Sequence, residues 1–262
     1  MKTVWINFSK YRFLLGELVK KDIKLKYRRS YLGILWTLLE PLLTTAVLAF
    51  VFSGLYHKSD RTFPVYILTG RLLYSFFSNS TKAAMKAIRS NSAMIKKVYV
   101  PKYIYPFSAV LSNYVTFAIS LVILAGAMLI FNVTPTIYML QAVVPLLMVL
   151  ILAMGTGMIL ATLAVFFRDL EYLWSVILML IMYTSAIFYD LSDKRFADNK
   201  LLEPIMKLFN PLYDIIINFR NAVFGHPLNQ QALIISAIYS FGTLLIGILL
   251  FYRKQDDFIL NI

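Results

Sequence analysis

The sequence lacks cysteine altogether and has only two histidines among its 262 residues. Without cysteine, no disulfide, thiolate metal site or cysteine nucleophile can form. His57 and His226 stand far apart in the sequence, which argues against a catalytic triad or a histidine-rich metal site. Neither an HExxH nor a GxSxG motif is present. We therefore expect no catalytic and no metal-binding residue in this chain.

A phosphate-binding loop is also missing. The nearest match, MGTGM at residues 154–158, has no lysine and lies within a long apolar run. The chain is therefore not expected to bind ATP through such a loop or to hold a cofactor of its own. If the protein performs work that consumes energy, the energy must come from a partner.

Acidic residues are scarce, with 13 Asp and Glu against 26 Lys and Arg and a net charge of +13. Such a charge can indicate nucleic-acid binding, but here the basic residues cluster beside apolar runs. The positive-inside rule predicts that placement for a membrane protein. We therefore expect a membrane protein with no nucleic-acid partner.

Long apolar runs dominate the rest of the chain, since 60% of its residues are hydrophobic. Six runs approach the length of about 18–25 residues that a membrane span requires, although the second and fifth are short. Spans satisfy their own backbone hydrogen bonds in lipid, so all six are predicted to be helices. The expected spans are residues 33–55, 63–80, 105–131, 140–167, 172–189 and 232–252.

Basic residues predict how these spans are oriented. The two termini and the loops on their side of the membrane hold eighteen Lys and Arg, whereas the loops on the other side hold seven. We therefore expect the richer set, and with it both termini, in the cytoplasm. The richer set consists of residues 1–32, 81–104, 168–171 and 253–262.

The N-terminal segment 1–32 is followed by an apolar run too long for a cleaved signal peptide. Within it, Phe8, Tyr11, Leu15 and Leu18 recur at helical spacing, with lysine and arginine between or beyond them. This pattern favours an amphipathic helix that lies among the membrane lipids at the interface, over an ordinary cytosolic helix.

The segment 81–104 carries six basic residues and no acidic ones. Met85, Ile88 and Ile95 share one helical face, and most of the basic residues fall on the other, before Pro101 ends the element. Such a helix can dock on a partner or bind anionic headgroups. The pattern alone weighs partner docking equally with a solvated helix that only sets topology.

The expected external loop 190–231 balances its charges but is rich in apolar residues from 201 to 224. Pro204, Pro211 and a Gly-His-Pro turn divide it into short pieces. We expect one or two short re-entrant helices in the outer leaflet before the last span. Such backbone at membrane depth hints at a pore mouth or an external gate.

Two ionisable residues lie within the expected spans. Glu40, followed by the helix-kinking Pro41, is in the first span, and Arg71 is near the middle of the second. Their depths differ by less than about 10 Å, so neighbouring helices would let them pair. Because charges in a bilayer are costly, a polar path is favoured over a purely structural pair or an arginine that snorkels outward.

Aromatic residues make up 15% of the chain. Composition alone favours an aromatic belt at the membrane interfaces. The alternative is a channel lining on which uncharged sugar rings stack and slide. The aromatic residues proposed for such a lining are Trp36, Tyr66, Tyr74, Phe188 and Tyr189.

Several motifs, in order along nearly the whole chain, resemble ABC-2 type permeases that export polysaccharides such as O-antigen, capsule and teichoic acid. The longest is YRRSYLGILW at residues 27–36, which is followed by Glu40-Pro41. The others are Gly70 with Phe76-Phe77, Asn91 with IKKVYVP at 95–101, Phe167-Arg168-Asp169, Ile187-Phe188-Tyr189 and Asn210-Pro211.

The resemblance implies a homodimeric permease that binds two copies of a separate ATPase, and that ATPase would hold the ATP and magnesium. The cargo would be a polysaccharide on a polyprenyl diphosphate carrier, exported across the cytoplasmic membrane of a bacterium or archaeon. Residues 33–262 would form the all-α, six-helix transmembrane domain. A cytosolic segment, 1–32, would precede it and contain an interface, or gate, helix.

The resemblance also implies roles for particular residues. The helix around 84–97 looks like a coupling helix on the ATPase, through Met85, Ile88, Arg89, Ile95, Lys96 and Lys97. The cations expected to attract the carrier diphosphate are Lys24, Lys26, Arg28 and Arg29. Arg168 and Asp169 would form a gating loop.

Two positions depart from the family pattern. Arg71 stands where an apolar residue is usual, which suggests a role specific to the substrate, and Ala186 stands where many members have proline. Two other functions are consistent with the sequence: an ABC-2 permease for a drug or lipid, and a membrane-embedded enzyme or channel that needs no ATPase. Glycosyltransferase genes beside this gene would favour the polysaccharide.

Overall fold

The computed structural model describes residues 2–28, 30–56, 61–97, 100–189 and 209–258, without the side chains of 2–10 and 53–56. Every regular element in these ranges is helical. The α-helices are α1 (Lys2–Tyr27), α2 (Trp36–Tyr56), α3 (Phe63–Ser90), α4 (Ser92–Ile95), α5 (Ile104–Ile130), α6 (Val143–Phe166), α7 (Leu170–Thr184), α10 (Pro211–Val223) and α11 (Gln230–Lys254). Short 3-10 helices are η1 (Gly33–Leu35), η2 (Ile137–Ala142) and η3 (Gln255–Asp257).

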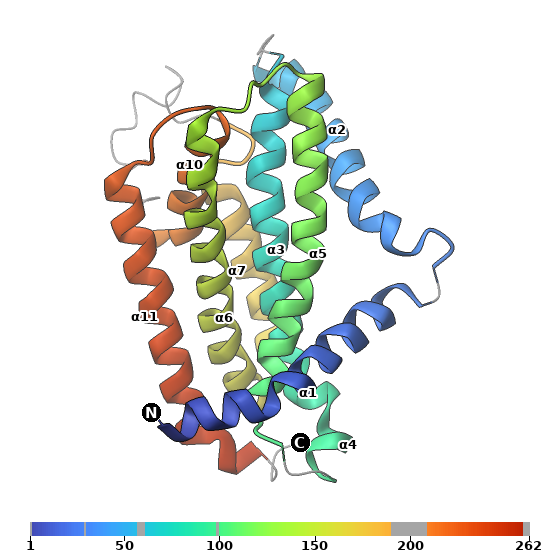
Figure 1. The fold of residues 1–262 in the computed structure, drawn as a ribbon, viewed down its shortest axis with the longest axis vertical. Coiled ribbons are helices and arrows are strands. Elements are labelled where there is room, and N and C mark those ends of the chain that lie inside the picture. Colours follow the sequence, from blue (N-terminus) through green and yellow to red (C-terminus); the bar gives the residue numbers. More distant parts are fainter. Residues whose placement is uncertain (1, 29, 57–60, 98–99, 190–208, 259–262) are drawn as a thin grey trace.

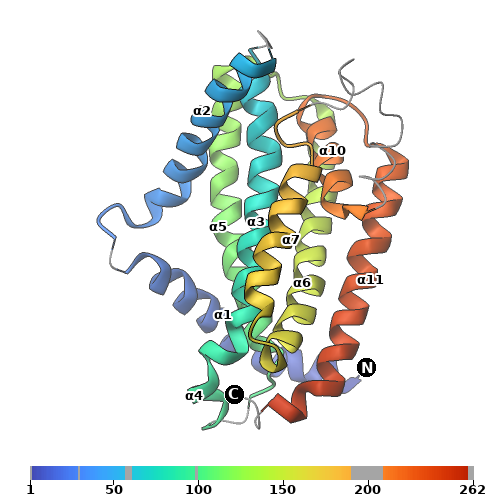
Figure 2. The same ribbon diagram turned by 180° about the vertical axis from the view of Figure 1, so that it is seen from behind.

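Helix α3 lies in the middle of a bundle in which α5, α6, α7 and α11 run roughly along the same axis, whereas α2 is tilted away from it (Figures 1 and 2). It contacts α2, α5, α6, α7 and α10. One end of the bundle carries α4 and is called the α4 end; the other carries η2 and α10 and is called the η2 end. The start of α1 and the end of η3 both lie at the α4 end.

The outer surface of the bundle is apolar, and its interior contains polar side chains beside an apolar core. Buried hydroxyl groups line α3 at Thr69, Ser78, Ser80 and Thr81. The outer helices instead expose large apolar side chains, such as Phe50 on α2, which is 82% exposed. Water would penalise such a surface, whereas hydrocarbon does not, so lipid is the environment that this bundle fits.

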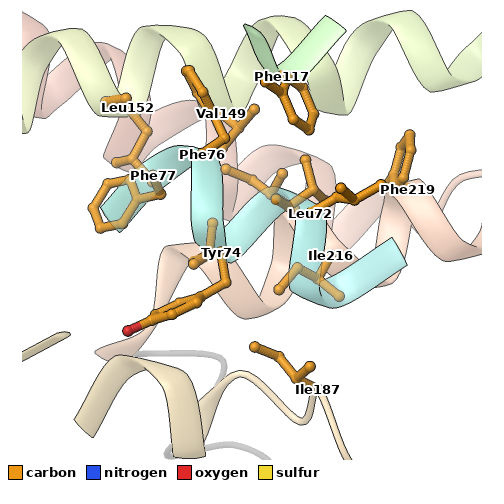
Figure 3. Packing of buried hydrophobic residues seen from close by; sticks show 14 of the residues in the cluster. Leu72, Tyr74, Phe76, Phe77, Phe117, Val149, Leu152, Ile187, Ile216 and Phe219 are labelled. Carbon is orange, nitrogen blue, oxygen red and sulfur yellow. The ribbon is translucent and has the colours of Figure 1, made fainter. Parts of the chain in front are cut away.

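The core forms where α3 meets its neighbours. Leu72, Phe76 and Phe77 of α3 pack with side chains from three other helices and from the segment after α7 (Figure 3). These partners are Phe117 of α5, Val149 and Leu152 of α6, Ile216 and Phe219 of α10, and Ile187. Helix α3 therefore contributes both the polar groups and the apolar core of the bundle.

Helices α6 and α11 approach each other closely through glycine. A Cβ atom at Gly155 would lie 2.4 Å from the backbone nitrogen of Leu244, and one at Gly247 would lie 2.6 Å from the Gly155 carbonyl oxygen. Small residues let transmembrane helices pack backbone against backbone. The MGTGM run thus serves helix packing here.

Helix α1 crosses the α4 end of the bundle (Figure 1). Leu18 is buried in a second apolar cluster with Ile88 of α3, Ile104 of α5 and Phe258, and Tyr11, Leu14 and Leu15 pack against this cluster. The predicted apolar face of this segment, as far as Tyr11, Leu15 and Leu18 describe it, therefore packs on the other helices of the chain. The side chain of Phe8 lies outside the described residues. Lys21 on the neighbouring turn donates a hydrogen bond to the Asn91 side chain at 3.2 Å.

The helices agree with the predicted spans in part. Four apolar segments are long enough to cross a membrane: Gly33–Phe52, Ile104–Ile130, Ile137–Phe166 and Gln230–Asp257. Helix α7 is apolar but ends at Thr184, after 15 residues. The expected external helices are described only at α10, because residues 190–208 lie outside the described ranges.

The segment around 84–97, which was expected to form a helix of its own, is mostly the last part of α3. Helix α3 continues without a break from Phe63 to Ser90, and only the four-residue α4 follows Asn91. Residues 81–90 contain alanine, lysine, methionine and arginine, which are strong helix formers, and no glycine or proline. Nothing in that stretch stops the helix.

The glycine contact between α6 and α11 predicts a stability loss for Gly155→Ala. The new methyl group would collide with the α11 backbone, and such overpacking costs about 1–3 kcal/mol. The thermal unfolding midpoint of the purified protein in detergent should fall. The matched control is Gly242→Ala on α11, where a Cβ meets nothing within 4 Å and helix propensity gains about 0.5–1 kcal/mol. Equal midpoints for the two variants would contradict the contact.

Candidate functional site

A stripe of polar side chains joins α3 to α7. Tyr66, Tyr74, Thr81 and Arg89 follow one another at intervals of about two turns, which puts them on one face of α3. The Tyr74 hydroxyl donates to the Leu178 carbonyl at 3.0 Å, and the Trp174 indole donates to the Thr81 hydroxyl at 3.1 Å.

At the η2 end, the Tyr66 hydroxyl donates to the carbonyl of Tyr189 at 2.8 Å. At the α4 end, the stripe ends in an ion-pair cluster. Glu171, in the first turn of α7, accepts a hydrogen bond from Arg89 and lies 3.0 Å from the Lys86 ammonium. The carboxylate also suits the positive end of the α7 dipole. Helices α3 and α7 are thus linked along their whole length.

The chain breaks sharply after α7. Ala186 has a φ of +47°, in the left-handed region that residues with a Cβ rarely adopt. This turn aims the Ala186 and Ile187 carbonyls at Arg220 of α10, whose guanidinium donates to them at 2.9 and 3.2 Å. At the position where many family members have proline, the chain therefore turns at Ala186 after the end of α7.

Arg220 is the centre of this arrangement. Its guanidinium also donates to the Tyr66 carbonyl at 3.3 Å and stacks 3.5 Å from the centre of the Tyr66 ring. A Cβ at Gly70 would lie 2.9 Å from this guanidinium, so glycine makes room for it. Sequence reasoning treated Arg220 as one of several balancing loop charges. The apolar residues around it in the sequence were the signal that it is buried.

Asn210 fixes the start of α10 against the end of α7. Its side-chain oxygen accepts from the Leu212 backbone and caps α10, and its amide donates to the hydroxyls of Thr184 and Ser185, both at 2.9 Å. Pro211 occupies the first turn, where its missing N–H costs nothing. The Asn210-Pro211 motif therefore positions the short helix at the η2 end.

A polar cavity of about 110 Å³ lies where the end of α1 and the start of α2 face α3 and α5. Glu40, Lys26 and Trp36 line it together with Asn79 and Asn113. The remaining lining residues are Tyr27, Thr37, Pro41, Leu72, Ser75, Phe76, Thr116, Phe117 and Ser120. Burial at this cavity lowers the pKa of Lys26, and the Glu40 carboxylate opposes that shift.

A second cavity, of about 460 Å³, is a groove between α2 and α7 with α3 behind it. Arg71 is the one charged residue among the described residues that line it. The others are Leu43, Thr44, Val47, Leu48, Phe52, Met182, Tyr183 and Phe188. Arg71 and Glu40 thus line different cavities, and within the described residues they form no ion pair.

The apolar residues expected to dock on a partner turn inward instead. Met85, Ile88 and Ile95 are 2%, 0% and 8% exposed and belong to the two apolar clusters of this chain. The pattern identified a buried face correctly, but the bundle and α1 cover it. The exposed side chains at this end include Met94, Lys96 and Lys97.

The remaining site candidates are spread over the bundle. Lys24 and Arg28 are exposed, and Arg29 lies outside the described residues. Arg168 and Asp169 are exposed where α6 gives way to α7, with Asp169 at the N-cap of α7. Lys24 and Lys26 lie in the last turn of α1, and Arg28 follows it directly.

The five candidate aromatics separate into two groups. The hydroxyls of Tyr66, Tyr74 and Tyr189 are bonded to backbone carbonyls, so these side chains hold the fold together. Trp36 lines the polar cavity, and Phe188 lines the groove, where it stacks on Phe52 with ring centres 4.9 Å apart. Of the five, Trp36 and Phe188 are the ones that line the two cavities described above.

Apolar helices long enough to cross a bilayer surround a polar central helix, with cavities beside it. The described residues hold no cluster of His, Asp or Glu fit for a metal. This architecture is that of a multi-pass membrane protein. The chain belongs to the ABC-2 type transporter family, whose sequence model matches residues 14–224.

Relatives with known names cover nearly the full chain. It is 28% identical to the O-antigen export system permease protein RfbA of Myxococcus xanthus, over 95% of each chain. It is also 28% identical to the RfbA permease of Klebsiella pneumoniae, over 94% of this chain and 93% of the relative. The polysialic acid transport protein KpsM of Escherichia coli is 25% identical, over 97% and 98%.

The turn after α7 predicts opposite outcomes for two substitutions of Ala186. Proline cannot adopt a φ of +47°, and a proline at 186 disfavours the near-helical backbone of Ser185, the residue before it. Ala186→Pro should therefore remove the Arg220 contacts and lower the unfolding midpoint. Ala186→Gly should be close to neutral, because the relief of about 1 kcal/mol offsets the added chain entropy. A proline variant as stable as the wild type would contradict this turn.

Proposed function

We propose that this chain is the permease subunit of an ATP-driven exporter that moves a lipid-linked polysaccharide across the cytoplasmic membrane. The observation that carries the proposal is the near-complete match to permeases named for O-antigen export and polysialic acid transport. The polar side chains that line the cavity beside Glu40 support it, because a sugar polymer needs hydrogen-bonding groups where lipid supplies none.

In this proposal α2, α3, α5, α6, α7 and α11 are six membrane crossings, and α10 is a re-entrant helix at the outer face. The α4 end faces the cytoplasm, because the basic segments gather there. Two copies of the chain assemble around a central path and bind two copies of a separate ATPase, which holds ATP and magnesium. The exposed apolar face of α7, including Leu173, Val176 and Leu180, suits burial against a second copy.

The ATPase would act on the α4 end. Met94 is exposed there beside the basic residues Lys96 and Lys97, which gives an apolar contact with a cationic rim. Glu171, held by Lys86 and Arg89, would carry movement of this end into α7. The polar cavity beside Lys26, with Lys24 and Arg28 nearby in the sequence, would receive the carrier diphosphate from the cytoplasm.

Depletion of the protein tests the export function. Polymer should disappear from the cell surface and accumulate inside on its lipid carrier, because synthesis continues while the path across the membrane is lost. Polymer is quantified in intact and in permeabilised cells, and re-expression of the wild-type chain should restore the surface fraction. Unchanged surface and internal polymer would rule out polysaccharide export and favour a drug or lipid as cargo.

The coupling surface is tested by Met94→Asp. An acidic residue in an apolar contact should lower the amount of ATPase that copurifies, because losing one central apolar anchor commonly costs about 2 kcal/mol. The control is Leu140→Asp, because Leu140 is also apolar and 75% exposed but lies in η2, at the opposite end of the bundle. Equal recovery of ATPase with both variants would mean that the partner binds elsewhere.

A further inference from the structure

In the part of the chain that the structure describes, the groove between α2 and α7 combines an apolar lining with the cation Arg71, and it is called the Arg71 groove. Leu48 and Phe52 of α2 form one wall, and Met182 of α7 with Phe188 forms the other. Its volume of about 460 Å³ is in the range of about 300–1,000 Å³ that is typical of ligand pockets.

The Arg71 guanidinium has hydrogen-bonding capacity that the protein leaves unused. Its Nε is buried without a hydrogen-bond partner, and its nearest ring, Tyr74, lies 6.0 Å away, at the limit of a cation–π contact. Among the described residues, no carboxylate lines the groove. A guanidinium in such surroundings favours an anion, and phosphate matches its fork of donors.

The position of Arg71 narrows the choice of anion. It stands eight residues into α3, about 12 Å from the Phe63 end along the axis. Resident phospholipids keep their headgroups at the membrane surface, so an anion at this depth must belong to a molecule in passage. This step rests on the proposed export function.

The apolar walls decide which part of the cargo fits. Sugar rings bring hydroxyl groups that need partners, and the walls of the Arg71 groove offer few. An isoprenoid chain needs none. We propose that the Arg71 groove holds the carrier lipid during export, with its phosphate on Arg71 and its first isoprene units against Leu48, Phe52 and Phe188.

Binding tests the proposal with the permease and its ATPase in phosphatidylcholine nanodiscs. The probes are a radiolabelled polyprenyl diphosphate and the uncharged polyprenol of equal length. The wild type should bind the diphosphate more tightly by about tenfold, the gain expected of hydrogen bonds to a charged group. Arg71→Met should lose this preference, and Arg71→Lys should keep most of it. Wild-type binding by Arg71→Met, or displacement of the diphosphate by acidic polymer without lipid, would overturn the proposal.

The absence of cysteine allows a direct test of what occupies the groove. Val47 lines it and is 63% exposed, so Val47→Cys introduces a single reactive thiol. Maleimide should label this thiol in the resting complex, and the polyprenyl diphosphate should slow the labelling. A disulfide between two copies in place of labelling would show that a second copy fills the groove, which would overturn the proposal.

Measuring surface polymer in cells distinguishes a failure of the groove assignment from a failure of the proposed export function. Arg71→Met should accumulate at least as well as the wild type, because it removes a charge from the membrane interior, yet surface polymer should fall. Lys254→Met removes a charge outside the groove and should export normally. If depletion abolishes export while Arg71→Met exports and binds like the wild type, only the groove assignment fails. If depletion leaves export unchanged, the proposed function itself fails.

Discussion

The constraint on which the bundle depends is that α3 is polar and central, so its polar groups must find partners inside the protein. Lipid supplies no hydrogen bonds, and each unsatisfied group there costs several kcal/mol. The stripe of Tyr74, Thr81 and Arg89 meets this requirement through α7. Helix α7, although it makes an exposed apolar surface, is therefore fixed by polar contacts on its inner side.

The same requirement shapes the η2 end. Helix α7 stops early, and the carbonyls freed at Ala186 and Ile187 would be orphaned in an apolar core. Arg220 satisfies them and stacks on Tyr66, and Asn210 binds the last hydroxyls of α7. A short helix, a left-handed turn and a buried arginine thus form one unit, in which removing any part leaves the others unsatisfied.

Sequence reasoning predicted the features that depend on local pattern. Four long apolar helices and the amphipathic face around Leu18 follow from composition and spacing. The prediction of a separate short helix around 84–97 was wrong, because a change from apolar to basic residues shows where a helix leaves the membrane and not where it ends. It also took the face of Met85 and Ile88 as a docking surface, since one sequence cannot tell whether an apolar face is covered by its own chain or by a partner. The pairing of Arg220 with carbonyls far along the chain has no local signature.

The two arginines beside α7 show that the hydrogen-bond partners of a buried charge, rather than the charge alone, indicate function. Both lie on helices that pack within the bundle, and both carry a cost of desolvation. The terminal nitrogens of Arg220 bind three carbonyl groups, and its guanidinium stacks on an aromatic face, so its conformation is fixed by the fold. Arg71 instead lines a groove, and the ring of Tyr74, its nearest aromatic contact, lies 6.0 Å away. A fold that selected only for stability would favour an apolar side chain there, so the retained cation is best explained by an anion that visits the groove.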